Sequence, residues 1–262
     1  MTQFSANLGF LWQELPLPDA IRAAKAAGFD AVECHYPYDV PIEAVRAALK
    51  ETGLTMLGLN TMRGDIAAGD NGLAAVPGRE EEARHAIESA IDYARATGTL
   101  NVHVMAGKAS GEAAHATFVA NLKHACKLAA EANITILIEP LNDRDAPDYF
   151  LRTSEQALGI IEEVGAPNIK LMFDCYHLQI MQGDLTRRLR AHLNSIGHIQ
   201  IASVPDRREP DHGELDYRYI LGLLEELGYD RPIGAEYRPA TSTEAGLQWL
   251  NDFKEMSASR SS

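Results

Sequence analysis

The sequence predicts a single (β/α)8 barrel, and two observations lead to this fold class. Short apolar strands alternate with amphipathic helical stretches from one end of the chain to the other, which is typical of a parallel sheet built from right-handed crossovers. The chain also has 262 residues, a length that fits eight such units. A doubly wound open sheet is the structural alternative. That fold more often has fewer strands, and a nucleotide-binding version would carry a glycine-rich turn that this chain lacks.

Eight short apolar segments are the expected strands. Each has four to six residues and lies between turn or helix signals. In chain order they are residues 4–8, 31–34, 55–60, 100–105, 134–139, 169–174, 197–202 and 232–237.

Start and stop signals mark the helices between these strands. The stretch 18–29 offers Asp19 as an N-cap, and the stretch 153–165 carries a Thr153-x-x-Gln156 capping box. In a capping box the two side chains satisfy backbone N–H groups at the first turn, so we expect a helix that begins directly after the threonine.

The chain shows no internal linker and no low-complexity segment. We therefore expect one barrel over residues 1–256, followed by a disordered tail at 257–262. One long stretch without a helical pattern, residues 61–78, follows the third strand. In a barrel this loop would lie on the C-terminal face, where active sites are built.

Composition and charge exclude several classes of protein. A formal net charge of −13 argues against a surface that binds phosphate backbones, so no nucleic-acid partner is expected. The chain has neither a run of about 18 apolar residues nor the pattern of a signal peptide, so we expect no membrane span and a cytoplasmic enzyme. A small-molecule substrate fits these properties. A homo-oligomer is compatible with the fold, although no interface is visible in the pattern.

The cysteines support a reducing location. Their odd number and wide spacing form no CxxC pair and no disulfide framework. No cysteine lies in a setting that would activate a thiol, so a catalytic cysteine is not expected. The three are Cys34, Cys126 and Cys175.

Oxygen-bearing side chains mark the ends of the last four strands. Glu139 and Asp174 end two apolar runs, and Gln200 and Glu236 lie near the ends of the next two. Consecutive strands of a barrel are neighbours, so these side chains are expected to meet around one point. A single acidic residue at a strand end usually caps a helix or faces solvent. Gln200 is the weakest member, because a glutamine inside a strand can also face solvent.

Such a cluster predicts a divalent metal ion. Three carboxylates in a low-dielectric pocket repel one another strongly, and a divalent cation relieves that repulsion. All four candidates offer hard oxygen donors, with no thiolate and no histidine among them. This donor set favours Mg²⁺ or Mn²⁺ over Zn²⁺, although Co²⁺ could substitute.

At these residues the sequence resembles the hydroxypyruvate isomerase family, within the xylose-isomerase-like barrels. Segments similar to that family occur over nearly the whole chain and include "AGFDAVE", "PGREEE", "FDCYHLQ", "GHIQIA" and "EYRP". The stretch "VPDRREPDHGELDY" is more similar to the 2-oxotetronate isomerases of that family. The resemblance implies a metal-dependent isomerase that interconverts the aldehyde and ketone forms of a small hydroxy-keto acid. Hydroxypyruvate and four-carbon 2-oxo acids both stay open.

The resemblance also implies roles for individual residues. Glu139, Asp174, Gln200 and Glu236 would bind the metal. Glu139 and Glu236 would also act as the acid–base pair that moves a proton through an enediolate, in an order that the sequence leaves open. Arg207, in the loop after the seventh strand, would pair with a substrate carboxylate, although the adjacent Arg208 could be confused with it.

Further candidates for substrate binding lie close to strand ends. His177 follows the sixth strand and could donate a hydrogen bond to a substrate oxygen. The others are Asn60, His103 and Lys108, and His103 could equally be a core residue. For four more residues the sequence predicts a location but no role. We expect His35 and Tyr36 in the pocket wall, Trp12 in the pocket or a lid, and Trp249 in the core.

Four other functions compete with the isomerase. A ketose 3-epimerase or an inosose dehydratase would use the same type of barrel, but a neutral sugar would not need Arg207 as a cation. A nucleic-acid repair endonuclease would need several zinc ions, many histidine ligands and a basic groove. A barrel that only binds a ligand would not need all four metal-binding candidates. The fold alone does not separate these functions.

Overall fold

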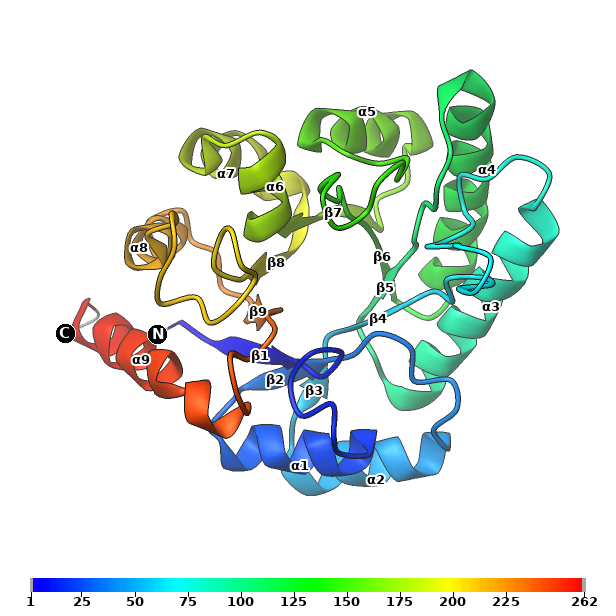
Figure 1. Ribbon diagram of the computed structural model, residues 1–262. Helices are drawn as coiled ribbons and strands as arrows, with labels where there is room; N and C mark the ends of the chain where they lie inside the picture. The colour runs from blue at the N-terminus through cyan, green and yellow to red at the C-terminus, as the bar shows by residue number, and fades with distance from the viewer. Residues whose placement is uncertain (1, 261–262) are drawn as a thin grey trace.

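The protein is a closed barrel of parallel strands surrounded by helices, as the sequence predicts (Figure 1). The computed structural model describes residues 2–260. Its strands are β1 (Phe4–Asn7), β2 (Ala31–Glu33), β3 (Thr55–Met56), β4 (Gly58–Asn60), β5 (Asn101–His103), β6 (Thr135–Ile138), β7 (Ile169–Asp174), β8 (Ile196–Ile201) and β9 (Ile233–Ala235). All eight expected strands are present, and the third is divided into β3 and β4.

Helices cover the outside of the strands. Those of the described residues are α1 (Leu17–Ala26), α2 (Ile42–Thr52), α3 (Glu80–Thr97), α4 (Gly111–Ala130), α5 (Ser154–Val164), α6 (Cys175–Met181), α7 (Leu185–His192), α8 (Tyr217–Glu226) and α9 (Gln248–Arg260), with short 3₁₀ turns at Leu193–Ser195 and Glu244–Gly246. None of the helices in residues 2–260 has the length and apolar character that crossing a bilayer requires.

The barrel closes at its divided third strand. Hydrogen bonds join the strands in the order β3-β2-β1-β9-β8-β7-β6-β5-β4. The N–H of Leu57, between β3 and β4, donates to the carbonyl of Val32 at 2.7 Å, and the N–H of Leu100 donates to the carbonyl of Met56 at 3.2 Å. Backbone bonds therefore leave both sides of this strand, and no open sheet edge remains there.

The helix starts show which of the predicted N-caps are correct. The capping box at α5 is confirmed, because the Thr153 side chain accepts a hydrogen bond from the N–H of Gln156 at 3.2 Å. Asp19 as the N-cap of α1 is wrong. Pro16 holds that position, and Asp19 lies inside the first turn, where its carboxylate pairs with Arg22. Pro16 itself has φ −57° and ψ 144°, so its backbone is extended and the helix begins at the next residue.

The last helix fixes the C-terminal part of the chain against the barrel. It continues through Arg260, so residues 257–260 are helical where the sequence analysis expects disorder. The N–H of Thr2 donates to the buried Oγ of Ser257 at 2.6 Å, which ties α9 to the segment before β1. Residues 261–262 of the expected tail lie outside the described residues.

Both tryptophans belong to the core beneath α9 and α1. Trp249 is fully buried and contacts the Phe4 ring edge-on at a centroid distance of 5.4 Å, as expected for a core residue. Trp12 does not line the pocket. It is buried against Phe29, and its indole N–H donates to Glu244. The apolar ring and the satisfied N–H make it a packing residue of the first loop.

Candidate active site

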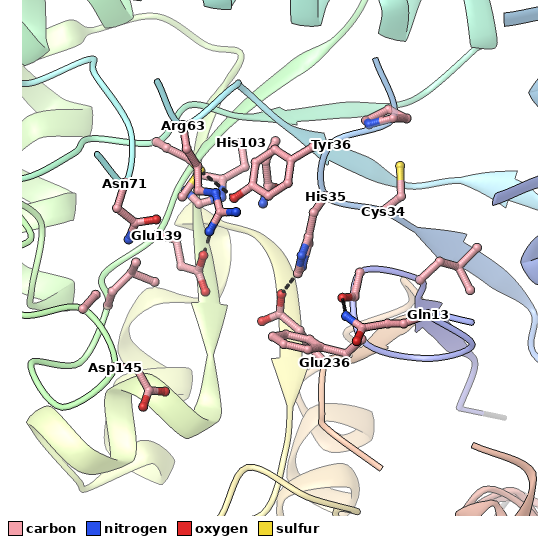
Figure 2. Close-up of a pocket in the computed structure, with 18 of the residues that line it drawn as sticks. Gln13, Cys34, His35, Tyr36, Arg63, Asn71, His103, Glu139, Asp145 and Glu236 are labelled. Carbon is pink, nitrogen blue, oxygen red and sulfur yellow. Dashed lines mark hydrogen bonds and ion pairs between the residues drawn. The ribbon is translucent and has the colours of Figure 1, made fainter. Parts of the chain in front are cut away.

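Polar side chains occupy the C-terminal ends of the strands, where active sites of this architecture lie. They are Asn7, Glu33, Asn60, His103, Glu139, Asp174, Gln200 and Glu236, all within one residue of a strand end. These ends surround a cavity of about 540 Å³ (Figure 2). Its charged and histidine lining residues are His35, Arg63, His103, Glu139, Asp145, His177, Arg207, Glu236 and Arg238.

Glu139 and Asp174 form one side of the site together with His177. One ligand-type atom of each of the three lies within 4.8 Å of the others, and all three residues are buried. The Nε2 atom of His177 is 3.6 Å from Asp174 and 3.9 Å from Glu139. Asp174 also caps α6, because its Oδ1 accepts a hydrogen bond from the N–H of Tyr176 at 2.8 Å.

A backbone contact decides how His177 can act. Its Nδ1 accepts a hydrogen bond from the N–H of Asn142 at 3.0 Å. A backbone N–H can only donate, so the neutral ring carries its proton on Nε2. Nε2 therefore faces Glu139 and Asp174 as a hydrogen-bond donor. This state suits a bond to a substrate oxygen, the role expected from the sequence, better than metal ligation.

Glu236 lies across the cavity from Glu139 (Figure 2). Its Oε1 accepts a hydrogen bond from Asn7 Nδ2 at 3.0 Å and lies 3.0 Å from Nε2 of His35. Its Oε2 lies 2.8 Å from Nη2 of Arg207. Three neighbours thus hold this carboxylate in one orientation.

Arg207 places a positive charge next to the carboxylates of Glu236 and Asp174. Besides Glu236, its Nη2 lies 3.5 Å from Asp174, and the guanidinium lies over the rings of Phe10 and Tyr176 at 4.9 Å from each centroid. Its neighbour Arg208 is exposed and donates to the carbonyl of Ala240 instead. Arg207, rather than Arg208, therefore reaches the cavity, and its charge is balanced by the protein's own carboxylates.

Burial and mutual repulsion shift the pKa values of the acids. Burial, and then the charges of Glu236 and Asp174, raise the pKa of Glu139 well above its usual value. Burial also raises the pKa of Asp174 to about 8, against the opposing effect of Arg207. It would raise the pKa of Glu236 too, but Arg207 and His35 outweigh it and lower that pKa. The three carboxylates thus need more positive charge than Arg207 provides before all are ionised.

A hydrogen-bonded group lies beneath the site, and the sequence analysis missed it. Oε2 of Glu33 accepts a hydrogen bond from Gln200 Nε2 at 2.9 Å and lies 3.1 Å from Nε2 of His198. Oε1 of Glu33 accepts one from the Ser5 hydroxyl at 3.0 Å. Gly234 leaves room for this group, since a Cβ there would lie 2.2 Å from Glu33 Oε1 and 2.8 Å from His198 Nε2.

The donor set fits a divalent metal ion. Two buried oxygens, Oε1 of Glu139 and Oε1 of Gln200, have no hydrogen-bond partner within residues 2–260. Both residues, with Glu236, line a small hollow below the main cavity. Because buried polar atoms normally have partners, these free carboxylate and amide oxygens are suited to a hard cation.

Of the remaining residues that the sequence suggested for the pocket, most line the cavity and Lys108 does not. Asn60 and His103 line the cavity, and Nδ1 of His103 lies 3.5 Å from Glu139. Burial lowers the pKa of His103 to about 4, which keeps its ring neutral. His35 and Tyr36 form part of the wall, as expected. Lys108 is exposed and is not among the lining residues.

Sequence reasoning missed Asn7, Glu33 and Arg63. A signal for the first two exists, because each is a polar residue inside a segment that reads as an apolar strand. Arg63 lies in the long loop after the third strand, and no local pattern separates it from a solvated arginine. The three cysteines are buried and free, and burial raises the pKa of the Cys126 thiol to about 12.

Comparison with known proteins assigns this barrel to a family. A family model described as a xylose isomerase-like TIM barrel matches residues 21–253. The chain belongs to the xylose isomerase-like TIM barrel family. The resemblance seen in the sequence is thereby confirmed at the level of the family.

Relatives of high identity are named as isomerases. A 2-oxo-tetronate isomerase from Cupriavidus necator is 46% identical and aligns over 97% of this chain and 99% of its own. Hydroxypyruvate isomerase from Escherichia coli is 41% identical over 97% of this chain and 100% of its own. These names confirm the expected relationship to hydroxypyruvate and 2-oxotetronate isomerases, and with it the isomerase class of enzyme.

Solved structures support the fold. A Brucella melitensis protein described as an AP endonuclease of family 2 is 42% identical, superposes with a TM-score of 0.93, and covers 96% of this chain and 99% of its own. A 3-keto-D-glucoside 4-epimerase from Escherichia coli has a TM-score of 0.82 at 22% identity and shows the fold alone.

Proposed function

We propose that the protein is a metal-dependent isomerase of a small hydroxy-keto acid, hydroxypyruvate or a 2-oxotetronate. The observation that carries this proposal is that two buried glutamates, Glu139 and Glu236, enter one cavity from opposite sides (Figure 2). Relatives at 41 and 46% identity named for these two substrates support the choice of substrate class.

Glu139, Asp174, Gln200 and Glu236 would hold the metal ion. When bound, a divalent ion supplies positive charge beside the substrate oxygens on which negative charge develops. Mg²⁺ and Mn²⁺ suit these oxygen donors.

The two glutamates would move the proton. Isomerisation takes a proton from one carbon and returns one to its neighbour through an enediolate, which needs a base and a conjugate acid near the two carbons. Glu236 is held by Asn7 and His35, and Glu139 keeps one oxygen free. Nε2–H of His177 would donate to a substrate oxygen beside Glu139. Arg207 would balance the charge of Glu236 and Asp174 while the proton moves.

Proton exchange tests this function directly. Metal-loaded and metal-stripped protein would be incubated in D₂O with hydroxypyruvate or a 2-oxotetronate and followed by NMR. We expect metal-dependent deuterium uptake at the carbon that gains the proton, together with the aldehyde isomer. Glu139→Gln and Glu236→Gln should each slow exchange by at least about 100-fold, the scale of general acid–base catalysis.

Glu209→Gln is the matched control for these variants. Glu209 is also a buried glutamate, but it accepts a hydrogen bond from the N–H of Ala240 and does not line the cavity. Full turnover by Glu236→Gln with metal still bound would remove Glu236 from the acid–base pair. If folded, metal-loaded wild type turned over neither acid but did act on a free ketose, the 3-epimerase function would replace the isomerase.

A further inference from the structure

Three arginines line the cavity, Arg63, Arg207 and Arg238. Arg238 is exposed, whereas Arg63 is partly buried and its charge is not balanced by a carboxylate of residues 2–260. Arg63, in the loop after β4, lines the cavity, and its buried Nε has no hydrogen-bond partner among residues 2–260. Within residues 2–260, no carboxylate lies within ion-pair distance of its guanidinium. Nε of Arg207 likewise has no hydrogen-bond partner among residues 2–260, but its Nη2 already lies against Glu236 and Asp174.

The protein holds Arg63 in place without neutralising it. The guanidinium lies over the Tyr36 ring, 4.8 Å from its centroid, and the Tyr36 hydroxyl donates to the sulfur of Met105 at 3.2 Å. On the backbone, the N–H of Gly72 donates to the carbonyl of Arg63 at 2.9 Å. The side chain is therefore preorganised by its aromatic neighbour and by its own loop.

That loop is itself attached firmly to the barrel. Asp70 accepts a hydrogen bond from the N–H of Asp65 at 2.8 Å and pairs with Arg79 at 2.7 Å. The N–H of Ala75 donates to the carbonyl of Ala106, next to the end of β5, at 2.7 Å. A loop with this many fixed points can place a binding group accurately.

An arginine in this state is suited to an anionic ligand. A partly buried cation loses hydration, and a carboxylate restores that loss through a two-pronged, charge-assisted hydrogen bond. Figure 2 shows Arg63 on the Glu139 side of the cavity, with Glu236 and His35 on the other side. A small acid whose carboxylate bound Arg63 would extend its remaining carbons toward the space between the two glutamates.

We propose that Arg63, stacked on Tyr36, binds the carboxylate of the substrate and so selects acids over neutral sugars. This role replaces the one that the sequence analysis gave to Arg207, whose guanidinium is occupied by Glu236 and Asp174. The assignment rests on the proposed function for the identity of the acid. The binding of a carboxylate can be measured separately.

Equilibrium binding tests the role of Arg63 in carboxylate binding separately from the proposed isomerase activity. Metal-loaded protein would be titrated by calorimetry with glycerate and with glycerol, which differ in one carboxylate. We expect wild type to bind glycerate more tightly, and Arg63→Gln to weaken glycerate binding by about 10- to 100-fold, the loss typical of a charge-assisted hydrogen bond. Arg63→Lys should recover part of the affinity, because it keeps the charge but not the two-pronged geometry.

Arg144→Gln is the matched control for charge. Arg144 is exposed on the loop after β6, on the same face of the barrel, and it does not line the cavity. Its removal should change glycerate binding by less than about threefold, because exposed charges are screened. For turnover of hydroxypyruvate, Arg63→Gln should raise KM by the same factor as the dissociation constant and leave kcat within about threefold.

Specific outcomes would overturn the proposal. They are glycerate binding no tighter than glycerol binding in wild type, a loss below threefold in Arg63→Gln, or an equal loss for both ligands. If wild type turned over neither keto acid, the proposed function would fail. The glycerate titration would still decide the role of Arg63.

Discussion

Gln200 shows how one hydrogen bond can select which atom an amide presents. The Glu33 carboxylate accepts from its Nε2, and the Ser5 hydroxyl and His198 approach the same carboxylate. Because the Glu33 oxygen accepts this hydrogen bond, the amide nitrogen of Gln200 faces Glu33. The amide oxygen is left without a hydrogen-bond partner among residues 2–260, and it lies next to the cavity acids. Glu33 does not line the main cavity, and its hydrogen bond to Gln200 connects it to the residues that surround the site.

We predict that Glu33→Gln weakens metal binding. The new amide can donate as well as accept, so Gln200 can turn its nitrogen toward the acids. Loss of such a supporting group typically lowers metal affinity by about 10- to 100-fold. Calorimetric titration with Mn²⁺ would measure the effect, with Glu209→Gln as the matched buried control. An unchanged Mn²⁺ affinity in folded Glu33→Gln would contradict the orienting role.

The sequence predicts the position of some residues of the site but not of Glu33, and the reason is physical. Glu139, Asp174 and Glu236 could be found because strand ends of a barrel converge, so position in the chain implies position in space. The contact of Glu33 with Gln200 joins β2 to β8, which are not neighbours in the sheet. It depends on side chains that meet across the barrel interior, and no local pattern encodes that meeting.

At the scale of elements, the N-terminus of α5 tests how much a cap contributes. The Thr153 side chain accepts from the N–H of Gln156, while the Gln156 side chain accepts from the N–H of Arg152 at 3.0 Å. We predict that Thr153→Ala lowers the free energy of unfolding by about 1 kcal/mol. Urea denaturation would measure the change.

Ser110 provides the control for this substitution. It occupies the N-cap position of α4, but its side chain makes no capping hydrogen bond. Ser110→Ala should therefore cost clearly less than Thr153→Ala. Equal losses would mean that the α5 cap contributes no more than an uncapped position.

The elements themselves were largely predictable, and their exceptions have local causes. Apolar runs between helical patterns identify every strand, because both faces of a barrel strand are buried. The division of the third strand at Leu57 was not foreseen. The apolar residues at 56, 57 and 59 are separated only by Gly58, and this pattern contains no signal for a break at Leu57. The helical state of residues 257–260 was missed because it depends on contact of Ser257 with Thr2, 255 residues away.

At the scale of the whole molecule, the proposed metal site would link stability to metal binding. A ligand that binds only the folded state stabilises it by about 2.7 kcal/mol at 100 times its dissociation constant. For a protein of this size that gain corresponds to a rise in Tm of about 5–10 °C. We therefore predict that saturating Mn²⁺ raises the Tm of chelator-treated protein by this amount.

Two variants make the thermal measurement specific. Asp174→Asn should lose most of the Mn²⁺-dependent rise in Tm, because it removes a buried carboxylate of the site. Asp92→Asn, at an exposed aspartate on α3 that pairs with Arg95 at 3.5 Å, should keep it. The same rise in both variants would place the metal elsewhere in the protein.

The crowding of Gly234 against Glu33, His198 and Gln200 limits how such a barrel can evolve. A Cβ at position 234 would lie 2.9 Å or less from an atom of each of these three side chains. A larger residue there requires a neighbouring side chain to shift or to become smaller, so the effect of each substitution depends on the residues around it. Residues in contact commonly show such non-additivity, at about 0.5–3 kcal/mol. The outer rim of the cavity can therefore diverge by single steps, whereas its floor has to change as a set.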